Sequence, residues 1–216
     1  MPPIMNRTTF LIDGFNLYHS LNDACWRHKQ RNVKWLNIHK LCRMYIPSLT
    51  PRATLEEIYY FSAFAFHRQN KDPEIIARHE LFIECLKATG VKVEMGRFKA
   101  KDVYCNGCKS LVKHYEEKET DVAISVKLLE LFVLDQCDSI VLVTGDTDII
   151  PAIRTAFNLF PEKRVYCAFP FRRKNTELAK IATDSFTIGV DRYQACQFPN
   201  PFITPDGRSL HKPGSW

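Results

Sequence analysis

The sequence lacks the features of membrane and secreted proteins. No apolar run approaches the ~20 residues that a membrane-spanning helix requires, and residues 1–9 contain no apolar signal-peptide core. Internal repeats and low-complexity segments are also absent. We therefore expect a cytoplasmic protein with no membrane partner. Its 216 residues, 45% hydrophobic and 12% aromatic, can bury a sizeable core in one main domain.

Cysteines spaced as in a disulfide framework are scarce. Eight cysteines are present, but most stand singly among apolar or helical segments: Cys25, Cys42, Cys85, Cys137, Cys167 and Cys196. This scatter argues against a secreted disulfide scaffold. We expect these thiols to lie free in the core.

The clearest motif that is present is an apolar run followed at once by acids. Residues 140–143 are apolar and mostly β-branched, which predicts a buried strand, and the turn after them contains Asp146 and Asp148. A helical pattern follows, so both acids lie where open α/β sheets place their sites. Asp148 or Thr147 could instead cap that helix. Because a cap needs one side chain only, the second acid calls for another explanation.

A second acid follows the first predicted strand. Residues 8–12 form this strand and run into Asp13, Gly14 and Phe15, before a helix begins at Leu17. Asp13 therefore also stands at the carboxyl end of a strand. Asn16 either holds a carboxylate or a water in place, or it caps the helix.

Asp121 precedes a strong helical pattern over residues 122–134. Positions four, seven and eleven residues after it are Ser125, Leu128 and Phe132, which lie on the same face of the helix. This face becomes apolar and is predicted to pack on the core, with Asp121 at its start. For Glu117 and Glu119 the favourable interaction of acids with the start of a helix is a sufficient explanation.

Strands and helices alternate along most of the chain. Further strands are predicted over residues 55–66, 91–98, 163–169 and 186–190, and helices over 36–45, 73–89, 149–159 and 176–182, the first of these ended by Pro47. This alternation predicts an α/β fold with a mostly parallel sheet covered on both faces by helices. Residues 191–216 are proline-rich without a period and are predicted to form a tail, wrapped on the body or ordered against a partner.

The strand ends would bring Asp13, Asp121, Asp146 and Asp148 to one edge of the sheet. Neighbouring carboxylates repel one another, and a hard divalent cation such as Mg²⁺ or Mn²⁺ relieves that repulsion through oxygen ligands. No histidine-rich or thiolate set accompanies the acids. Such a site suits phosphoryl chemistry, because a bound metal lowers the pKa of a water and stabilises a leaving oxygen.

A basic loop is predicted at the same edge. Arg172, Arg173 and Lys174 follow the strand over residues 163–169, and the whole chain carries a formal net charge of +6 with a pI of about 8.9. The three cations could grip a phosphate backbone, or they could form a solvated loop. The overall charge favours a polyanionic partner but falls short of a dedicated nucleic-acid coat.

Residues 99–115 interrupt the alternation with a predicted hairpin. Cys105 and Cys108 flank Asn-Gly at its tip and could bind Zn²⁺ as thiolates. Only His114 lies near them in sequence, so Cys85, His79 or a partner subunit of a homodimer would have to complete the site. Exposed free thiols are one alternative. A redox pair is another, although this motif does not open a helix in the thioredoxin manner.

Three motifs together resemble those of the NYN domain, in the LabA-like branch of the PIN-like nucleases. They are LIDGFN over residues 11–16, ETDV over 119–122 and TGDTD over 144–148. The resemblance covers residues 8–190 and implies a three-layer α/β/α sandwich that cleaves RNA with a divalent metal. It implies metal ligands at Asp13, Asp121, Asp146 and Asp148 and a polar partner at Asn16. We thus expect a nuclease domain over residues 1–190, with the hairpin at 99–115 inserted and a tail over 191–216.

The sequence therefore predicts a Mg²⁺- or Mn²⁺-dependent ribonuclease with RNA as partner. One alternative is a noncatalytic RNA-binding or regulatory module that retains the fold. Another is a phosphohydrolase of the haloacid dehalogenase type, but that class expects an acid two residues after Asp13, where this chain has Phe15. Nucleases of this size are often restrained, which makes a regulatory protein partner a further expectation.

Overall fold

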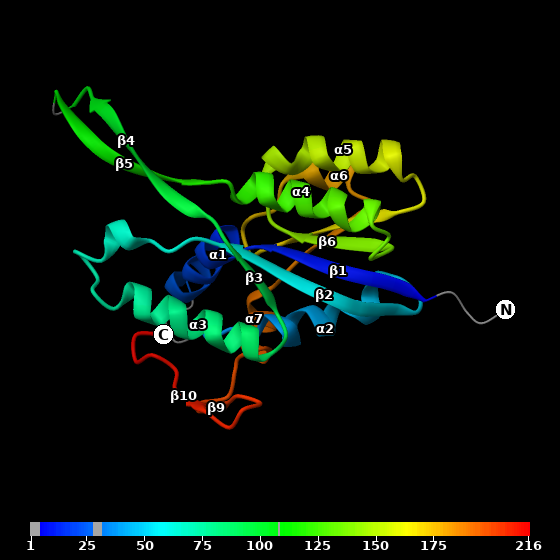
Figure 1. The fold of residues 1–216 in the computed structure, drawn as a ribbon, viewed down its shortest axis with the longest axis horizontal. Helices are drawn as coiled ribbons and strands as arrows, with labels where there is room; N and C mark the ends of the chain where they lie inside the picture. Colours follow the sequence, from blue (N-terminus) through cyan, green and yellow to red (C-terminus); the bar gives the residue numbers. More distant parts are fainter. Residues whose placement is uncertain (1–4, 28–31, 108) are drawn as a thin grey trace.

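A six-stranded parallel sheet forms the centre of the computed structural model, which describes residues 5–27, 32–107 and 109–216. The strands lie in the order β3-β2-β1-β6-β7-β8, and every neighbouring pair is parallel (Figure 1). Their bounds are β1 Asn6–Asp13, β2 Ala53–Ser62, β3 Lys92–Met95, β6 Ser139–Val143, β7 Arg164–Phe169 and β8 Asp184–Thr187. The predicted parallel sheet is confirmed.

Helices cover both faces of this sheet, as Figure 1 shows. One face carries α1 Gly14–Arg27, α2 Ile38–Leu49, α3 Ile75–Ala88 and α7 Val190–Ala195. The other carries α4 Thr120–Val133, α5 Ile150–Leu159 and α6 Thr176–Ile181. Short 3₁₀ turns, η1 Phe66–Arg68 and η2 Thr147–Ile149, complete the set. The α/β/α arrangement is therefore as predicted.

Two separate cores arise because successive strand side chains point to opposite faces. In β1, Phe10 and Ile12 join the core under α1 and α3, whereas Leu11 joins the core under α4 and α5. In β6, Val141 and Leu142 divide in the same way. These strands are apolar throughout because both of their faces are buried, as is usual for parallel sheets.

The order of the strands reverses between β1 and β6. From β1 the chain adds β2 and β3 on one side, and from β6 it adds β7 and β8 on the other. The crevice beyond the carboxyl ends of two such strands is where open α/β sheets bind ligands. Asp13 ends β1, and the loop after β6 begins beside it.

The predicted hairpin exists and is longer than expected. Strands β4 Arg97–Cys105 and β5 Ser110–Lys118 pair antiparallel and project from the body as an arm (Figure 1). The strand predicted over residues 91–98 is wrong at its end, because β3 stops at Met95 and Arg97 already belongs to the arm. The backbone turns at Gly96, whose N–H donates to the carbonyl of Ser62 at 2.7 Å.

Two other predicted boundaries are wrong. The strand predicted to reach residue 66 ends at Ser62, because the aromatic side chains beyond it pack in a loop, where Phe64 lies 5.0 Å from His79 between ring centroids. The helix predicted to end before Pro47 runs to Leu49 with Pro47 inside it. A proline this near a helix end removes a single hydrogen bond, which the packed face of α2 tolerates.

Residues 190–216 pack against the body. Val190 opens α7 and does not end a strand, so the predicted strand over 186–190 is wrong there, and β9 Phe202–Ile203 pairs with β10 Ser209–Leu210. Tyr193 and Cys196 are fully buried. Trp216 packs on Phe82 of α3, with ring centroids 5.6 Å apart. Of the two arrangements predicted for this segment, the structure therefore has the one wrapped on the body.

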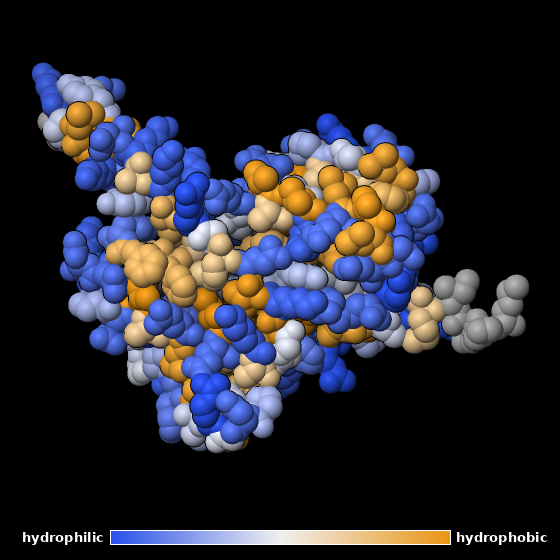
Figure 2. Space-filling view, viewed as in Figure 1, coloured by the Kyte–Doolittle hydropathy of each residue, from blue (hydrophilic) through white to orange (hydrophobic). Residues whose placement is uncertain are grey.

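Helix α4 is apolar on both sides. Leu128 and Phe132, on the face predicted to turn inward below Asp121, are 0% and 2% exposed. Exposed apolar side chains also gather over α4 and α5 in Figure 2, and Val122, Val126 and Val133 of α4 are among the exposed apolar residues. No helix that the structure describes is both long and apolar enough to cross a membrane.

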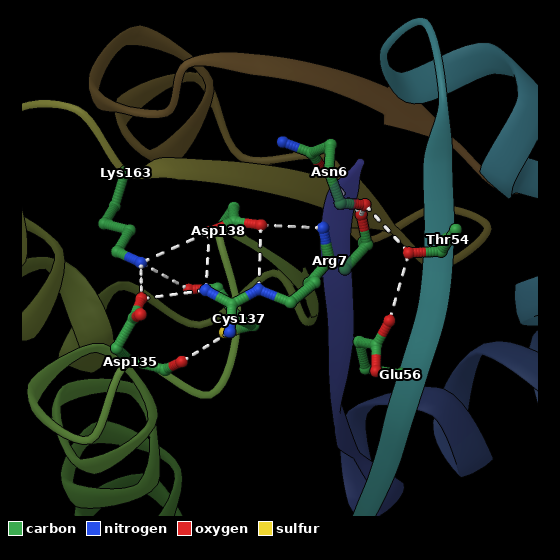
Figure 3. Close-up of polar contacts among 9 residues, drawn as sticks. Asn6, Arg7, Thr54, Glu56, Asp135, Cys137, Asp138 and Lys163 are labelled. Atoms are coloured by element: carbon green, nitrogen blue, oxygen red, sulfur yellow. Dashed lines mark hydrogen bonds and ion pairs between the residues drawn. The ribbon is translucent and has the colours of Figure 1, made fainter. Parts of the chain in front are cut away.

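An ion-pair network holds the opposite, amino-terminal edge of the central strands (Figure 3). The guanidinium of Arg7 in β1 donates to both carboxylate oxygens of Asp138, at 3.1 and 2.8 Å, and its backbone N–H donates to the same group at 2.9 Å. Lys163, with its side chain only 8% exposed, donates to Asp135 at 2.5 Å and to the carbonyl of Cys137 at 2.8 Å. The network joins the starts of β1, β6 and β7.

Candidate active site

Asp13 is the buried centre of the site. It ends β1, is 5% exposed, and accepts two hydrogen bonds: from the backbone N–H of Asn16 at 2.8 Å and from the hydroxyl of Thr144 at 2.9 Å. Thr144 follows β6, so these bonds tie the two central strand ends together. Gly14 is required next to it, since a Cβ there would lie 2.5 Å from the carbonyl oxygen of Phe61.

Asn16 holds the loop after β6. Its side-chain oxygen accepts a hydrogen bond from the backbone N–H of Gly145 at 3.2 Å. Asn16 lies inside the first turn of α1, and the capping position belongs to Asp13, which accepts the N–H three residues on. Of the roles open from sequence, the helix cap is wrong, and Asn16 instead positions backbone that leads to Asp146.

Asp146 takes the capping role that the sequence offered to Asp148 or Thr147. Its carboxylate accepts from the N–H of Asp148 at 3.0 Å and so caps η2, while its own N–H donates to Thr144 at 3.1 Å. Asp148 itself is exposed. The two acids of the loop therefore have different surroundings.

An acidic cavity of about 200 Å³ brings three of the four predicted aspartates together. It is lined by Asp13, Phe15, Asn16, Glu117, Thr120, Asp121 and Asp146. Asp148 is not among these lining residues. Asp121 enters the cavity from the first turn of α4, so the prediction from its helical face places it correctly.

Glu117 is a member that sequence reasoning passed over. It lies in β5 at the base of the arm, and its carboxylate accepts from the hydroxyl of Thr120 at 2.7 Å. In the sequence nothing separates Glu117 from Glu116 and Glu119. Only the register of the arm, with Glu117 opposite Phe98, decides which of them lies beside the aspartates.

The acids of the cavity raise one another's pKa. Burial, and then the nearby charges of Asp146 and Asp13, raise the pKa of Asp121 to about 6. Burial also raises the pKa of Glu117 to about 7, with Asp13 and Asp121 adding to the effect. Burial also raises the pKa of Asp13, and the charge of Asp146 raises it further, while hydrogen bonds from Asn16, Thr144 and the backbone of Phe15 act in the opposite direction. The negative charges are thus crowded and uncompensated.

The donor set consists of carboxylate oxygens, which suits hard divalent cations such as Mg²⁺. Within residues 5–27, 32–107 and 109–216, no three His, Cys, Asp or Glu side chains stand ready to hold one ion together. The fit to a cation therefore rests on the crowding of charge and on the chemistry of the donors.

A basic groove of about 320 Å³ adjoins the acidic cavity. Arg172, Arg173 and Lys174 line it, together with Asn16 and Asp146, which the two depressions share. Arg173 is partly neutralised by Asp23 at 2.8 Å, and its carbonyl packs on Gly145, where a Cβ would approach it to 2.1 Å. Arg172 and Lys174 are exposed. The predicted basic loop thus lies beside the predicted acids.

Cys105, the described cysteine of the predicted pair, lies away from this site at the end of β4. Cys105 is a half-buried free thiol, and Cys108 lies outside the described residues. Of the proposed further ligands, Cys85 is fully buried in the core and His79 shares a hydrogen bond with Ser62 at 3.3 Å. Zinc binding by Cys105 and Cys108 stays a prediction.

Comparison with known families identifies the domain. The family model of the NYN domain matches residues 7–189. The chain belongs to the NYN domain family. Its fold is accordingly of the PIN-like nuclease type, and the match spans both strand ends, the arm and the basic loop of the NYN domain.

Two relatives extend the comparison. The 6-hydroxy-3-succinoylpyridine 3-monooxygenase HspA of Pseudomonas putida (strain DSM 28022 / S16) is 26% identical over 247 residues, which cover 97% of this chain and 75% of that protein. The crystal structure of a protein of unknown function, VPA0982 from Vibrio parahaemolyticus RIMD 2210633, is similar with a TM-score of 0.57 at 17% identity. The similar region covers 88% of this chain and 96% of the Vibrio protein's chain. The second likeness concerns the fold alone.

Proposed function

We propose that this NYN domain is a Mg²⁺- or Mn²⁺-dependent ribonuclease, related to the LabA-like branch. The observation that carries the proposal is the contact between the acidic cavity and the basic groove, which share Asn16 and Asp146. A strand of RNA lying across both would place a phosphate beside the carboxylates while its neighbours meet the cations.

Asp13, Asp121 and Asp146 would hold the cation, with Glu117 as a further oxygen donor and Asp148 at the rim. A bound divalent ion would relieve their repulsion and supply a water of lowered pKa as nucleophile. The water oxygen would form the new bond to phosphorus and give up a proton to solvent, while the bond from phosphorus to the ribose oxygen would break and that oxygen would take up a proton. Thr144 and Asn16 keep Asp13 and the Asp146 loop in place through the hydrogen bonds at 2.9 and 3.2 Å.

Phosphate binding falls mainly to Arg172 and Lys174. Both are exposed at the rim of the groove, whereas Arg173 is engaged by Asp23 and by its packing on Gly145. We infer that Arg173 shapes the loop and that its two neighbours provide the charge that RNA meets.

The test is cleavage of labelled single-stranded and structured RNA with Mn²⁺, Mg²⁺ or EDTA. Asp146→Asn should lower cleavage at least about a hundredfold. It should keep the fold, because an asparagine of nearly the same shape can still accept the capping hydrogen bond from the N–H of Asp148. The matched control is Asp184→Asn, which makes the same charge change at the start of β8, at the opposite edge of the sheet. It should cleave as the unaltered protein does.

Cleavage that ignores EDTA, or that survives in Asp146→Asn, would overturn the proposal. The alternative, a noncatalytic RNA-binding or regulatory module, has its own signature in the same experiment. The unaltered protein and Asp146→Asn would then bind RNA equally, with and without the metal, and neither would cut it.

A further inference from the structure

A second cavity shares Phe15 with the acidic cavity. It is framed by aromatic side chains from α1, β2, α3, β4 and the C-terminal segment: Phe15, Tyr18, Tyr60, Phe82, Phe98 and Trp216. Its volume is about 110 Å³. We call it the aromatic cavity. None of the chemistry proposed above uses it.

Its size fits one planar ring. An engineered apolar cavity of about 150 Å³ in another protein binds benzene, so 110 Å³ behind an open mouth is the scale of one six-membered ring. Aromatic walls favour a planar partner, because stacked and edge-on ring contacts add to the gain from burial.

One wall offers hydrogen bonds. Ser62 and His79 line the cavity and are bonded to each other at 3.3 Å between Oγ and Nε2. Burial lowers the pKa of His79 to about 4, so at neutral pH its ring carries both a donor and an acceptor nitrogen. A polar edge in an otherwise apolar cavity suits a heterocycle better than a hydrocarbon.

The charged residues around the cavity are of one sign. Lys34, Arg68 and Arg78 line it, and no Asp or Glu of the described chain does. Arg78 is paired with Asp72, which leaves two cations to meet a negative group on the ligand. The site therefore suits a ring that carries a phosphate.

Phe15 lines both the aromatic cavity and the acidic cavity. One strand of RNA could thus place a base in the aromatic cavity, with one of its phosphates near Lys34 and Arg68 and the next phosphate in the acidic cavity. We propose that the aromatic cavity binds a pyrimidine base of the RNA next to the phosphate that is cut. The inference rests on the proposed nuclease function and adds a base preference to it, because a two-ring purine exceeds the space.

The first test needs no cleavage. Titration calorimetry with uridine 5′-monophosphate should show binding, which ribose 5-phosphate, lacking the base, should match only at concentrations on the order of tenfold higher. Adenosine 5′-monophosphate should also bind more weakly. Ala65→Phe, which fills the cavity from its wall, should abolish the preference for uridine. Ala77→Phe is the matched control, on the exposed side of α3.

The second test compares cleavage of oligouridylate and oligoadenylate by the same proteins. A preference for oligouridylate that Ala65→Phe removes and Ala77→Phe keeps supports the inference. Metal-dependent cleavage without base preference, and with equal binding of the mononucleotides, overturns the inference and leaves the nuclease intact. Uridine 5′-monophosphate binding that Ala65→Phe abolishes, without any cleavage, keeps the cavity as a nucleotide site and overturns the nuclease.

Discussion

The side-chain oxygen of Asn16 accepts a hydrogen bond from the backbone N–H of Gly145 at 3.2 Å, and so joins the first turn of α1 to the loop after β6. Through this bond one half of the sheet fixes the position of an acid supplied by the other half. Asn16 is therefore a positioning residue for Asp146.

Asn16→Ala should lower kcat for RNA cleavage by about ten- to a hundredfold at a stability cost of only about 1 kcal/mol, because one hydrogen bond is lost and the loop is freed. Steady-state kinetics with urea unfolding will check both numbers. Asn158→Ala, at an exposed position of α5, serves as control and should change neither. An unfolded Asn16→Ala protein would contradict the positioning role.

Gly145 admits no side chain. A Cβ there would lie 2.1 Å from the carbonyl oxygen of Arg173, so Gly145→Ala should separate the β6 and β7 loops and cost about 1–3 kcal/mol. Cleavage should fall with it, because Asp146 and Arg172 lie on these loops. Gly189→Ala is the comparison, since nothing lies within 4 Å of its added Cβ, and thermal melting should separate the two variants.

Glu117 should make stability depend on pH in the metal-free protein. Its pKa is about 7 in the fold against an ordinary 4.5, so between these values the unfolded chain has already lost a proton that the fold keeps. The contribution of Glu117 to the free energy of unfolding should therefore decrease as pH rises from about 4.5 to 7. Glu117→Gln should remove that part of the decrease.

Urea unfolding over this pH range will measure the effect. Glu116→Gln is the control, because Lys118 lowers the pKa of Glu116 and the change there should not flatten the profile. Added Mn²⁺ should raise the melting temperature most above about pH 7, where the carboxylates are charged. A Glu117→Gln profile with the same slope as the wild type over this range would refute the assignment of Glu117 to the crowded acids.

The pKa shift of Asp138 should change stability with pH in the opposite direction to that of Glu117. Its hydrogen bonds with Arg7 lower its pKa to about 2, so its contribution is present above the ordinary 3.8 and disappears as pH falls toward 2. Because both side chains are about a third exposed, we expect Asp138→Ala to cost on the order of 1–2 kcal/mol near neutral pH. Chemical denaturation at two pH values will show whether the cost of Asp138→Ala becomes smaller in acid. Asp102→Ala, at an exposed position of the arm, is the control, and its effect on stability should not change between the two pH values.

The fold could be predicted from the sequence because each central strand is a short apolar run with a sharp end. Residues 140–143 and the acids after them defined β6 and its loop, and the same logic placed Asp13. It also placed Asp121, since a helix projects its first turn onto a predictable face.

The features that could not be predicted from the sequence depend on strand register and on packing between distant segments. Glu117 and its neighbours are equivalent until β4 and β5 pair. The aromatic cavity draws Tyr18, Phe82 and Trp216 from distant segments, and no local pattern links them. The prediction that Pro47 ends the helix was wrong for a related reason. The packing of α2 on the core outweighs the local tendency of proline to end a helix.

The order of the chain also governs when the site can exist. Asp13 and Asp121 precede β6, whereas Asp146 and the cations at Arg172 and Lys174 follow it. A nascent chain that ends before β6 lacks Asp146 and therefore cannot form the complete set of acids. On the nuclease function proposed above, cleavage would require β6 to be in place beside β1, and an incomplete chain would spare the messenger that encodes it.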